Sequence, residues 1–187
     1  MRLFLAIDLP EALRRDLAEI RTELEPRCPG WRWVRPEGIH LTLRFLGEVE
    51  RERDAHSRES WSRVCAASGK ARFRLGGLGV FPGPSRPRVL WVAVNEEPGS
   101  ASRLESLAHG LEEAARELGF AREARPFRPH LTLARAARVG RPTLPPPASR
   151  GEGALVEAGE IVLFRSELAP AGARYTRLAA FPLGSDL

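Results

Sequence analysis

One tetrapeptide occurs twice in this chain and constrains the fold more than any other feature of the sequence. HLTL covers residues 40–43 and again residues 130–133. An apolar run and a segment with helical spacing of leucines precede each copy, with LFLAID (3–8) in the first half and LWVAVN (90–95) in the second. This agreement in order, pattern and spacing predicts a duplicated strand–helix–strand unit, whose pseudo-twofold relation brings the two histidines together. We therefore expect an α+β fold of two lobes in a single domain, residues 1–187.

Apolar periodicity and turn residues predict the elements of this unit. Helices are expected after Asp8, which is placed to cap the first one, and over about 50–67 and 100–118. Strands are expected at residues 2–7, 31–34, 40–46, 72–81, 88–94, 130–135, 160–168 and 173–181. GGLG (76–79) predicts a bulge or a close packing site, and the Pro- and Gly-rich segment 139–153 predicts a surface loop.

Strand geometry assigns a chemical face to each copy of the repeat. Side chains alternate along a strand, so His40 and Thr42 share one face of the first copy, as His130 and Thr132 do in the second. The apolar residues between and after them are expected to face the core: Leu41, Leu43, Phe45, Leu131 and Leu133. One HLTL alone is most simply an ordinary strand, but two copies at equivalent places indicate a shared site.

Two imidazoles and two hydroxyls that line one groove suit acid–base chemistry at a phosphorus centre. A neutral imidazole takes a proton from the attacking oxygen, and a protonated imidazole gives one to the leaving oxygen. Two hydroxyls can hold the non-bridging oxygens. Histidine can do either job near neutral pH.

Other chemistries fit the sequence less well. A zinc site needs three or four ligands at characteristic spacing, and no cluster supplies a third, so we expect no metal and no cofactor. A covalent ATP-using ligase needs a lysine nucleophile, but Lys70 stands in SGKAR without a phosphate-binding loop. Cys28 and Cys65 follow no metal spacing and are expected to be reduced, partly buried thiols.

Charge favours a polyanionic partner. The net charge is +5, and Lys70 is the only lysine among 29 basic residues. The planar fork of arginine suits phosphate and stacks on bases, so nucleic acid is a reasonable partner, although an arginine-rich genome would produce the same bias. No apolar run approaches the roughly 20 residues of a membrane span, and the first ten residues lack a signal peptide's apolar region. We therefore expect a cytoplasmic protein and no membrane partner.

Four segments carry a resemblance to a known family: RLFLAIDLP, HLTLRFLGEV, RPFRPHLTLAR and SELAPAGARYTRL. They resemble the 2H phosphoesterases, specifically the bacterial and archaeal RNA 2′,3′-cyclic phosphodiesterases, also called 2′-5′ RNA ligases, and the match spans nearly the whole chain. The resemblance implies a bilobal fold with two antiparallel sheets around a central groove and helices on the outside. It also implies metal-free hydrolysis of a 2′,3′-cyclic phosphate RNA end to a 2′-phosphate, with a weak reverse reaction that forms a 2′-5′ bond.

The same resemblance implies the site residues. Matching the motifs gives His40, Thr42, His130 and Thr132 as the catalytic set, with His130 as the base that activates water and His40 as the acid. Arg135 completes an H-x-T-x-x-R pattern like the family's substrate-contacting arginine. Its parity places it on the core face of a regular strand, so it reaches the groove only if the strand ends near residue 134 or a bulge intervenes. The alternative is a plain surface arginine.

Six further residues carry expectations of their own. Arg44 shares parity with His40 and is a second candidate substrate contact, with a rim salt bridge as the alternative. Core packing outweighs base stacking for three aromatic residues, and two histidines on helices are expected to be solvated: Trp33, Trp91, Phe127, His56 and His109.

Two other functions stay open at this point. One is an RNA-end-binding module that uses the same groove without turnover, which the intact pair of motifs argues against. The other is a phosphodiesterase that acts on a small cyclic nucleotide, with the same catalytic residues. We expect the protein to be a monomer.

Overall fold

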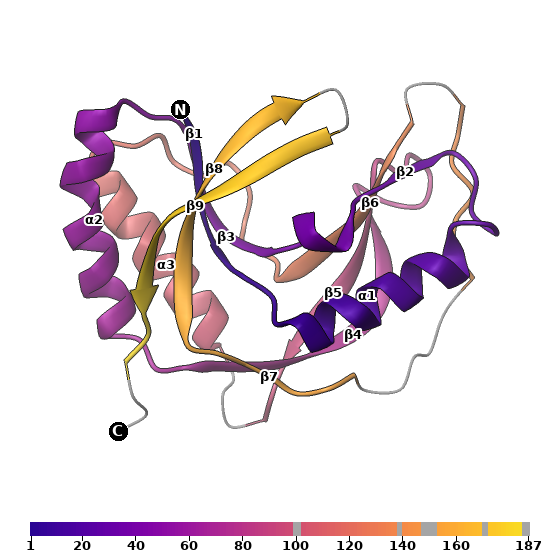
Figure 1. The fold of residues 1–187 in the computed structure, drawn as a ribbon, viewed down its shortest axis with the longest axis horizontal. Helices are drawn as coiled ribbons and strands as arrows, with labels where there is room; N and C mark the ends of the chain where they lie inside the picture. Colours follow the sequence, from indigo (N-terminus) through magenta and orange to yellow (C-terminus); the bar gives the residue numbers. More distant parts are fainter. Residues whose placement is uncertain (99–101, 138–139, 147–152, 170–171, 185–187) are drawn as a thin grey trace.

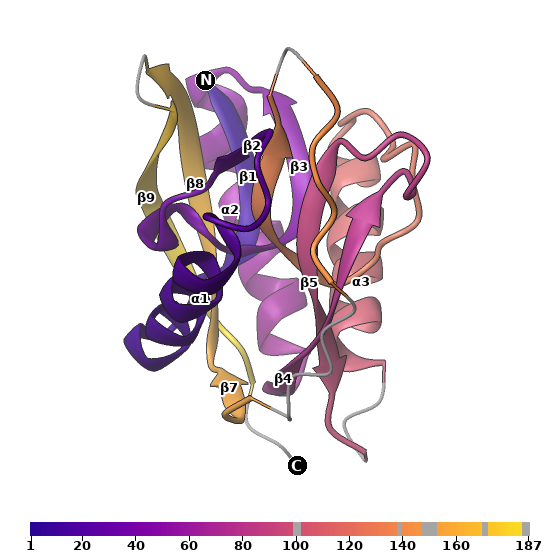
Figure 2. The ribbon, with the colours of Figure 1, turned by 90° about the vertical axis from the view of Figure 1, so that its right-hand side faces the viewer.

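Two antiparallel sheets organise the computed structural model, which describes residues 1–98, 102–137, 140–146, 153–169 and 172–184 (Figure 1). The first sheet has the order β3 (Leu41–Glu48), β1 (Arg2–Ile7), β8 (Glu160–Ala169) and β9 (Gly172–Pro182). The second has the order β2 (Trp31–Trp33), β6 (His130–Ala136), β5 (Val89–Glu96), β4 (Ala71–Phe81) and β7 (Val156–Ala158). Figure 2 shows β8 and β9 on one side of the molecule and β4 and β5 on the other.

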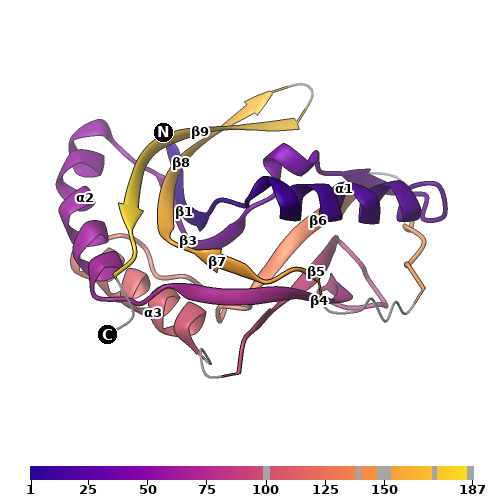
Figure 3. The ribbon, with the colours of Figure 1, turned by 60° about the horizontal axis from the view of Figure 1, so that its bottom comes forward.

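Helices flank the sheets. The helices are α1 (Glu11–Leu24), α2 (Arg51–Ala66) and α3 (Arg103–Glu117), and a short 3-10 helix, η1 (Pro36–Gly38), precedes β3. Helices α2 and α3 pack against each other on one side of the molecule, and α1 lies on the opposite side (Figures 1 and 3). The predicted α+β class with two antiparallel sheets and outer helices is confirmed. None of the helices in the described ranges is long and apolar enough to span a membrane.

One hydrophobic core joins the two halves of the chain. A single cluster of buried side chains includes Leu5 and Leu41 from the first sheet together with Leu90 and Leu131 from the second. Helix α3, which belongs to the second repeat, packs against β3 of the first sheet. The apolar residues of α1 and α3 that recur at helical spacing are buried in this cluster, which is why these segments form helices here.

The strand pairing shows which positions of the two repeats are equivalent, and this correspondence differs from the one that the sequences suggest. Ala6 of β1 lies opposite Thr42, and Trp91 of β5 lies opposite Thr132. The sequence alignment of the repeats instead matches Ala6 with Ala93, so it is wrong by two positions. An even shift keeps every side chain on its face, and an apolar run therefore reads equally well in either register.

Equivalent bulges interrupt β3 and β6. Between the pairs Ala6–Thr42 and Leu5–Arg44, Leu43 is an extra residue on β3. Leu133 is the equivalent extra residue on β6, between Thr132 and Ala134. An extra residue reverses the facing of the strand beyond it. Each bulge comes directly after the H-x-T motif, so the side chains that follow the motif do not have the parity expected from regular alternation.

Three smaller expectations concern the GGLG segment, a cap at Asp8 and a loop over 139–153. GGLG forms both a bulge and a close packing site, because the β4–β5 register shifts between Leu75 and Leu78 and a Cβ on Gly79 would collide with the Trp91 ring. Asp8 does not cap α1, whose N-cap is Pro10 without a side-chain bond. Strand β7 was not predicted. Residues 140–146 of the predicted 139–153 loop contain no helix or strand, and the rest of that loop except residue 153 lies outside the described residues.

Candidate active site

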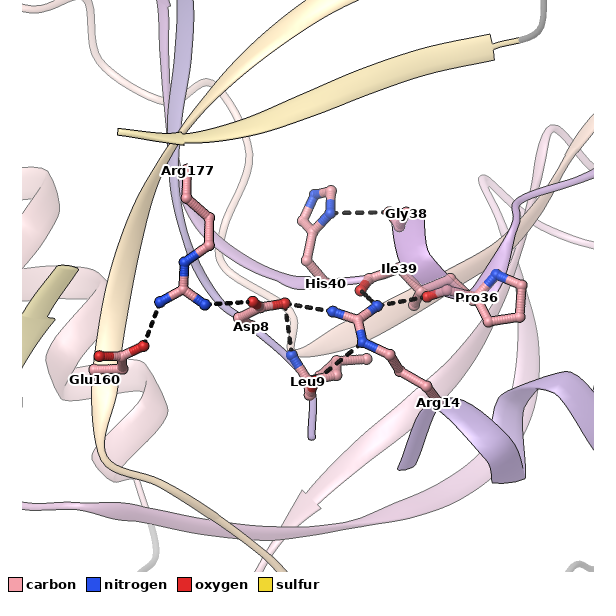
Figure 4. Close-up of polar contacts among 9 residues, drawn as sticks. All are labelled: Asp8, Leu9, Arg14, Pro36, Gly38, Ile39, His40, Glu160 and Arg177. Atoms are coloured by element: carbon pink, nitrogen blue, oxygen red, sulfur yellow. Dashed lines mark hydrogen bonds and ion pairs between the residues drawn. The ribbon is translucent and has the colours of Figure 1, made fainter. Parts of the chain in front are cut away.

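The backbone holds both histidine rings in the same way. His40 Nδ1 lies 3.1 Å from the carbonyl oxygen of Gly38, two residues earlier (Figure 4). His130 Nδ1 lies 2.6 Å from the carbonyl oxygen of Arg128, again two residues earlier. A carbonyl oxygen only accepts, so each Nδ1 carries the hydrogen and each neutral ring presents the lone pair of Nε2. The two Nε2 atoms are therefore the groups left for chemistry.

Aromatic rings form the surroundings of His40. Its ring centroid lies 4.6 Å from that of Phe4 and 4.9 Å from that of Tyr175, which meets it edge-on. Phe4 also stacks on Phe164, and Phe4 and Phe164 belong to a second small cluster of buried residues, separate from the main core. This cluster supports the ring of His40 from β1, β8 and β9 and keeps water from one side of it.

His130 has aromatic neighbours from the second sheet. Its ring lies 5.0 Å from the centroid of Phe81 in edge-on contact and 6.2 Å from that of Trp91. Trp91 is half-buried and stacks on Phe81, while its strand neighbours Leu90 and Val92 are buried. The prediction that Trp91 packs in the core is therefore wrong. Its side chain lies on the same face of the second sheet as Thr132 and His130 of the neighbouring strand β6.

The other two aromatic residues assigned to the core do pack there. Trp33 and Phe127 are partly buried against the main cluster. His56 and His109 are exposed on α2 and α3, as expected for residues outside a site.

The environment of His40 favours its neutral form. Burial lowers the pKa of His40 to about 4, against the raising effects of the Gly38 carbonyl and the Asp8 carboxylate. The positive charges of Arg135 and Arg14 lower the pKa further. In the protein without substrate His40 is therefore neutral at pH 7.

The pKa of His130 moves in the same direction. Burial lowers it, the hydrogen bond to Arg128 opposes this effect, and the charge of Arg135 adds to the lowering. Arg135 therefore acts on both imidazoles, although they belong to different sheets. Its charge also lowers the pKa of Tyr175, against the larger raising effect of burial. These shared effects indicate that His40, His130 and Tyr175 all lie near the guanidinium of Arg135.

The bulges decide which residues join the histidine face, by which we mean the surface carrying His40, Thr42, His130 and Thr132. Beyond the bulge in β3, Phe45 is 52% exposed and its ring lies 5.9 Å from that of Phe4. The prediction that Phe45 faces the core is therefore wrong. Arg135 takes the equivalent place beyond the bulge in β6 and is exposed. The bulge that sequence parity required for Arg135 to reach the groove is thus present.

The prediction that Arg44 contacts the substrate is wrong. Arg44 is 3% exposed, and its Nε lies 2.5 Å from Glu112 Oε2, with Glu123 also within ion-pair distance. Its guanidinium also donates to the carbonyls of Phe45 and Ala121. The extra residue Leu43 turns Arg44 away from the histidine face. Arg44 therefore joins α3 and the segment after it to β3, and it is not a substrate contact. The salt bridge expected as the alternative is present, but Arg44 is buried and does not lie at a rim.

Arg32 is a site candidate that parity did not single out. It lies directly opposite Arg135 in the β2–β6 ladder, and both side chains are exposed. No hydrogen bond or ion pair joins either guanidinium to a residue in the described ranges. Like charges at directly opposed positions repel each other, so a bound anion would stabilise this pair. Only the pairing of β2 with β6, which are about a hundred residues apart, reveals it.

Metal ligands do not gather in the described part of the chain. It contains no group of three or more histidine, cysteine, aspartate or glutamate side chains that could hold an ion. Cys28 and Cys65 are buried free thiols, and burial raises the pKa of Cys65 to about 12.

Comparison with known proteins places these features in a family context. The family model of LigT-like phosphoesterases matches residues 7–91 and 96–175. The RNA 2′,3′-cyclic phosphodiesterase of Thermus thermophilus is 40% identical over 195 aligned positions, which cover 100% of this chain and 92% of that protein. The RNA 2′,3′-cyclic phosphodiesterase of Escherichia coli is 33% identical, with 97% of this chain and 96% of that protein covered.

Solved structures agree with these matches. A crystal structure of a Thermus thermophilus protein superposes with a TM-score of 0.79 at 36% identity, covering 100% of both chains. Escherichia coli LigT in complex with 3′-AMP superposes with a TM-score of 0.78 at 32% identity, covering 97% of both chains.

Proposed function

Because this chain belongs to the LigT-like phosphoesterase family, we propose that it hydrolyses the 2′,3′-cyclic phosphate at the end of an RNA to a 2′-phosphate. The observation that carries this proposal is the matched pair of histidines. Each ring has Nδ1 bound to a carbonyl two residues earlier and Nε2 left for proton transfer. Relatives that are named RNA 2′,3′-cyclic phosphodiesterases support the choice of substrate.

The reaction divides proton transfer between the repeats. Nε2 of His130 takes a proton from water as its oxygen attacks phosphorus, and the bond from phosphorus to the 3′ oxygen breaks. Nε2–H of His40 gives its proton to that leaving oxygen. The product is a 2′-phosphate with a free 3′-hydroxyl, and exchange with solvent resets both rings. The same sequence, with a 5′-hydroxyl RNA end in place of water as the nucleophile and the 3′ oxygen again leaving, forms a 2′-5′ bond.

Charges near the rings support these roles. Asp8 raises the pKa of His40, whereas no carboxylate in the described part of the chain contributes to the pKa of His130. A bound phosphodiester brings a negative charge that favours the protonated form of a neighbouring imidazole. Together with Asp8 this charge acts against burial and against the positive charges of Arg135 and Arg14, and so favours the cationic form of His40 that the general acid requires.

The remaining groups of the histidine face would bind substrate. The hydroxyls of Thr42 and Thr132 donate to the non-bridging phosphate oxygens, and Arg135 balances their negative charge. Arg32 beside Arg135 suits the next phosphate along the RNA, and the exposed ring of Phe45 offers a surface for a base.

The test is hydrolysis of a short RNA with a 2′,3′-cyclic end in excess EDTA. We expect unchanged turnover and a 2′-phosphate product, because proton transfer by two imidazoles needs no metal. Product identity can be read by resistance or sensitivity to enzymes specific for each phosphate position, or by mass and ³¹P NMR. Loss of activity in EDTA with recovery on adding one divalent ion would contradict the metal-free mechanism.

The same assay separates the other two functions. Tight binding of the RNA end without any product would favour a binding module. Turnover of a cyclic mononucleotide with no gain from a longer RNA would favour a small cyclic nucleotide as substrate.

The two threonines should each matter less than the histidines. Thr42→Val and Thr132→Val remove one hydroxyl and keep the branched shape, so we expect each to lower kcat by on the order of 10² through loss of one hydrogen bond to a phosphate oxygen. Steady-state kinetics on the cyclic RNA end measure this. A matched control is Thr22→Val on α1, whose exposed hydroxyl donates to the Ala18 carbonyl within the same helix. Wild-type kcat in both variants would remove the threonines from the mechanism.

A further inference from the structure

Arg14 on α1 binds the turn that carries the acceptor of His40 (Figure 4). Its Nη1 donates to the carbonyl of Pro36 at 2.7 Å and lies 3.4 Å from the carbonyl of Ile39. Between these two carbonyls in the chain is that of Gly38, which accepts the hydrogen of His40 Nδ1. One guanidinium nitrogen therefore binds the carbonyls of Pro36 and Ile39, on either side of the Gly38 carbonyl that orients the His40 ring.

Asp8 holds Arg14 in place. Asp8 Oδ1 accepts from Arg14 Nη2 and from the backbone N–H of Leu9, the latter at 3.0 Å. Asp8 Oδ2 accepts from Arg177 of β9 at 2.8 Å, and Arg177 also binds Glu160. Arg14 Nε donates to the Leu9 carbonyl at 3.1 Å. All three guanidinium nitrogens of Arg14 are thus bound, and its side chain is only 15% exposed, so it is fixed before substrate arrives.

In the second repeat a backbone contact holds the segment before the histidine. Pro129, directly before His130, has its carbonyl oxygen 3.4 Å from the backbone N–H of Val94 on β5. In the first repeat β1 ends at Ile7, short of the corresponding position, and among the described residues no strand donor reaches the Ile39 carbonyl. Arg14 supplies the donor that the shorter strand lacks. The repeats therefore bind their histidine rings in the same way but hold the segment before each histidine by different means.

We propose that Arg14 is a positioning residue for His40: its guanidinium holds the η1 turn so that Gly38 keeps the hydrogen on Nδ1 and Nε2 faces the substrate. This inference rests on the proposed function for its kinetic consequence and on geometry alone for its effect on the ring. A turn free to move would let the imidazole rotate or take the other tautomer, and small misplacement of a reacting group is costly.

The test is ¹⁵N NMR of the full-length protein labelled in histidine, read beside steady-state kinetics. In wild type we expect both His40 and His130 as the Nδ1–H tautomer above pH 7. In Arg14→Gln we expect the His40 nitrogens to shift toward a mixture of tautomers while those of His130 stay unchanged. We expect kcat to fall by on the order of 10- to 10²-fold, with KM nearly constant, because Arg14 does not contact the substrate.

Two further variants complete the design. Arg14→Lys keeps the charge, but a lysine ammonium cannot reproduce the planar fork, so both readouts should lie between wild type and Arg14→Gln. It also provides the measurement if Arg14→Gln does not fold. The control is Arg21→Gln on the same helix, where the native arginine pairs with Glu25 at the surface, and it should leave both readouts at wild-type values.

The possible results separate this inference from the proposed function. An unchanged His40 spectrum in folded Arg14 variants overturns the positioning role, whether or not kcat falls. A shifted His40 spectrum with wild-type kcat also overturns it, since catalysis would then not depend on how Arg14 positions the His40 ring. If the wild-type protein does not turn over cyclic RNA ends, the proposed function fails, and a selective shift of His40 over His130 still supports the geometric part.

Discussion

Replacing His40 or His130 by alanine is expected to lower the rate of cyclic-phosphate hydrolysis by about 10²- to 10⁴-fold. Each variant removes the Nε2 atom that carries a proton, and the partner ring cannot do both transfers in one turnover. The double variant should lose little more than either single variant, because the pair acts as a unit. Single-turnover kinetics on an RNA with a 2′,3′-cyclic end give the comparison directly.

The control for this experiment is His109→Ala, which changes an exposed histidine on α3 and should stay near wild type. Circular dichroism and thermal melting would establish that each variant is folded. Near wild-type turnover in folded His40→Ala or His130→Ala would refute the two-histidine mechanism and favour the RNA-end-binding module.

A sulfur substrate distinguishes the acid from the base. A thiolate leaves without protonation, so an RNA end whose cyclic phosphate has sulfur in place of the 3′ oxygen needs no general acid. With this substrate we expect His40→Ala to recover most of its lost rate and His130→Ala to recover little. The opposite result would exchange the two roles.

Arg135→Gln is expected to lower kcat/KM by on the order of 10² and to move the pH optimum upward. The loss follows from removing a charge-assisted contact to the phosphate. The pH effect follows from the influence of Arg135 on both rings, since its positive charge lowers the pKa of His40 and of His130. Without that charge both pKa values rise.

Both limbs of the pH profile should shift in the same direction. In the free protein both histidine pKa values lie below the usual 6.5, because burial and Arg135 disfavour the charged forms. The profile of kcat/KM against pH should be bell-shaped, rising as the base loses its proton and falling as the acid loses its own. Its maximum should lie below pH 6.5 in wild type. Raising both pKa values in Arg135→Gln moves both limbs to higher pH.

Arg32→Gln is the matched comparison for this prediction. It removes the same charge from the position directly opposite Arg135, but Arg32 is not among the groups that shift either histidine pKa. We expect weaker RNA binding in this variant and an unshifted pH profile. Equal shifts in both variants would mean that net charge, and not the position of Arg135, sets the profile.

Much of the candidate site was predictable from local sequence. Two copies of HLTL at equivalent places predict two strands that each present a histidine and a threonine on one face, since alternation is a property of any extended strand. Helical spacing of leucines likewise predicted α1 and α3, because an amphipathic helix must bury that stripe. These features depend on neighbouring residues alone, so the sequence determined them.

The tertiary structure decided what joins the histidines. The bulges at Leu43 and Leu133 exist only in the pairing of β3 with β1 and of β6 with β5, and they turn Phe45 and Arg135 toward the site. The bulge at Leu43 also turns Arg44 toward the interior. An extra residue costs a strand little locally, and its place is set by the partner strand, so no period in the sequence marks it.

Long-range contacts decided the rest. Asp8 follows a strand and precedes a helix, where a capping role is the local expectation, yet Arg14 and Arg177 take its carboxylate. Arg32 and Arg135 become neighbours only because β2 pairs with β6. The sequence by itself determined the two H-x-T faces, because period-two alternation is local. Only the tertiary structure decided which charges and rings surround them, because those partners come from strands far apart in the chain.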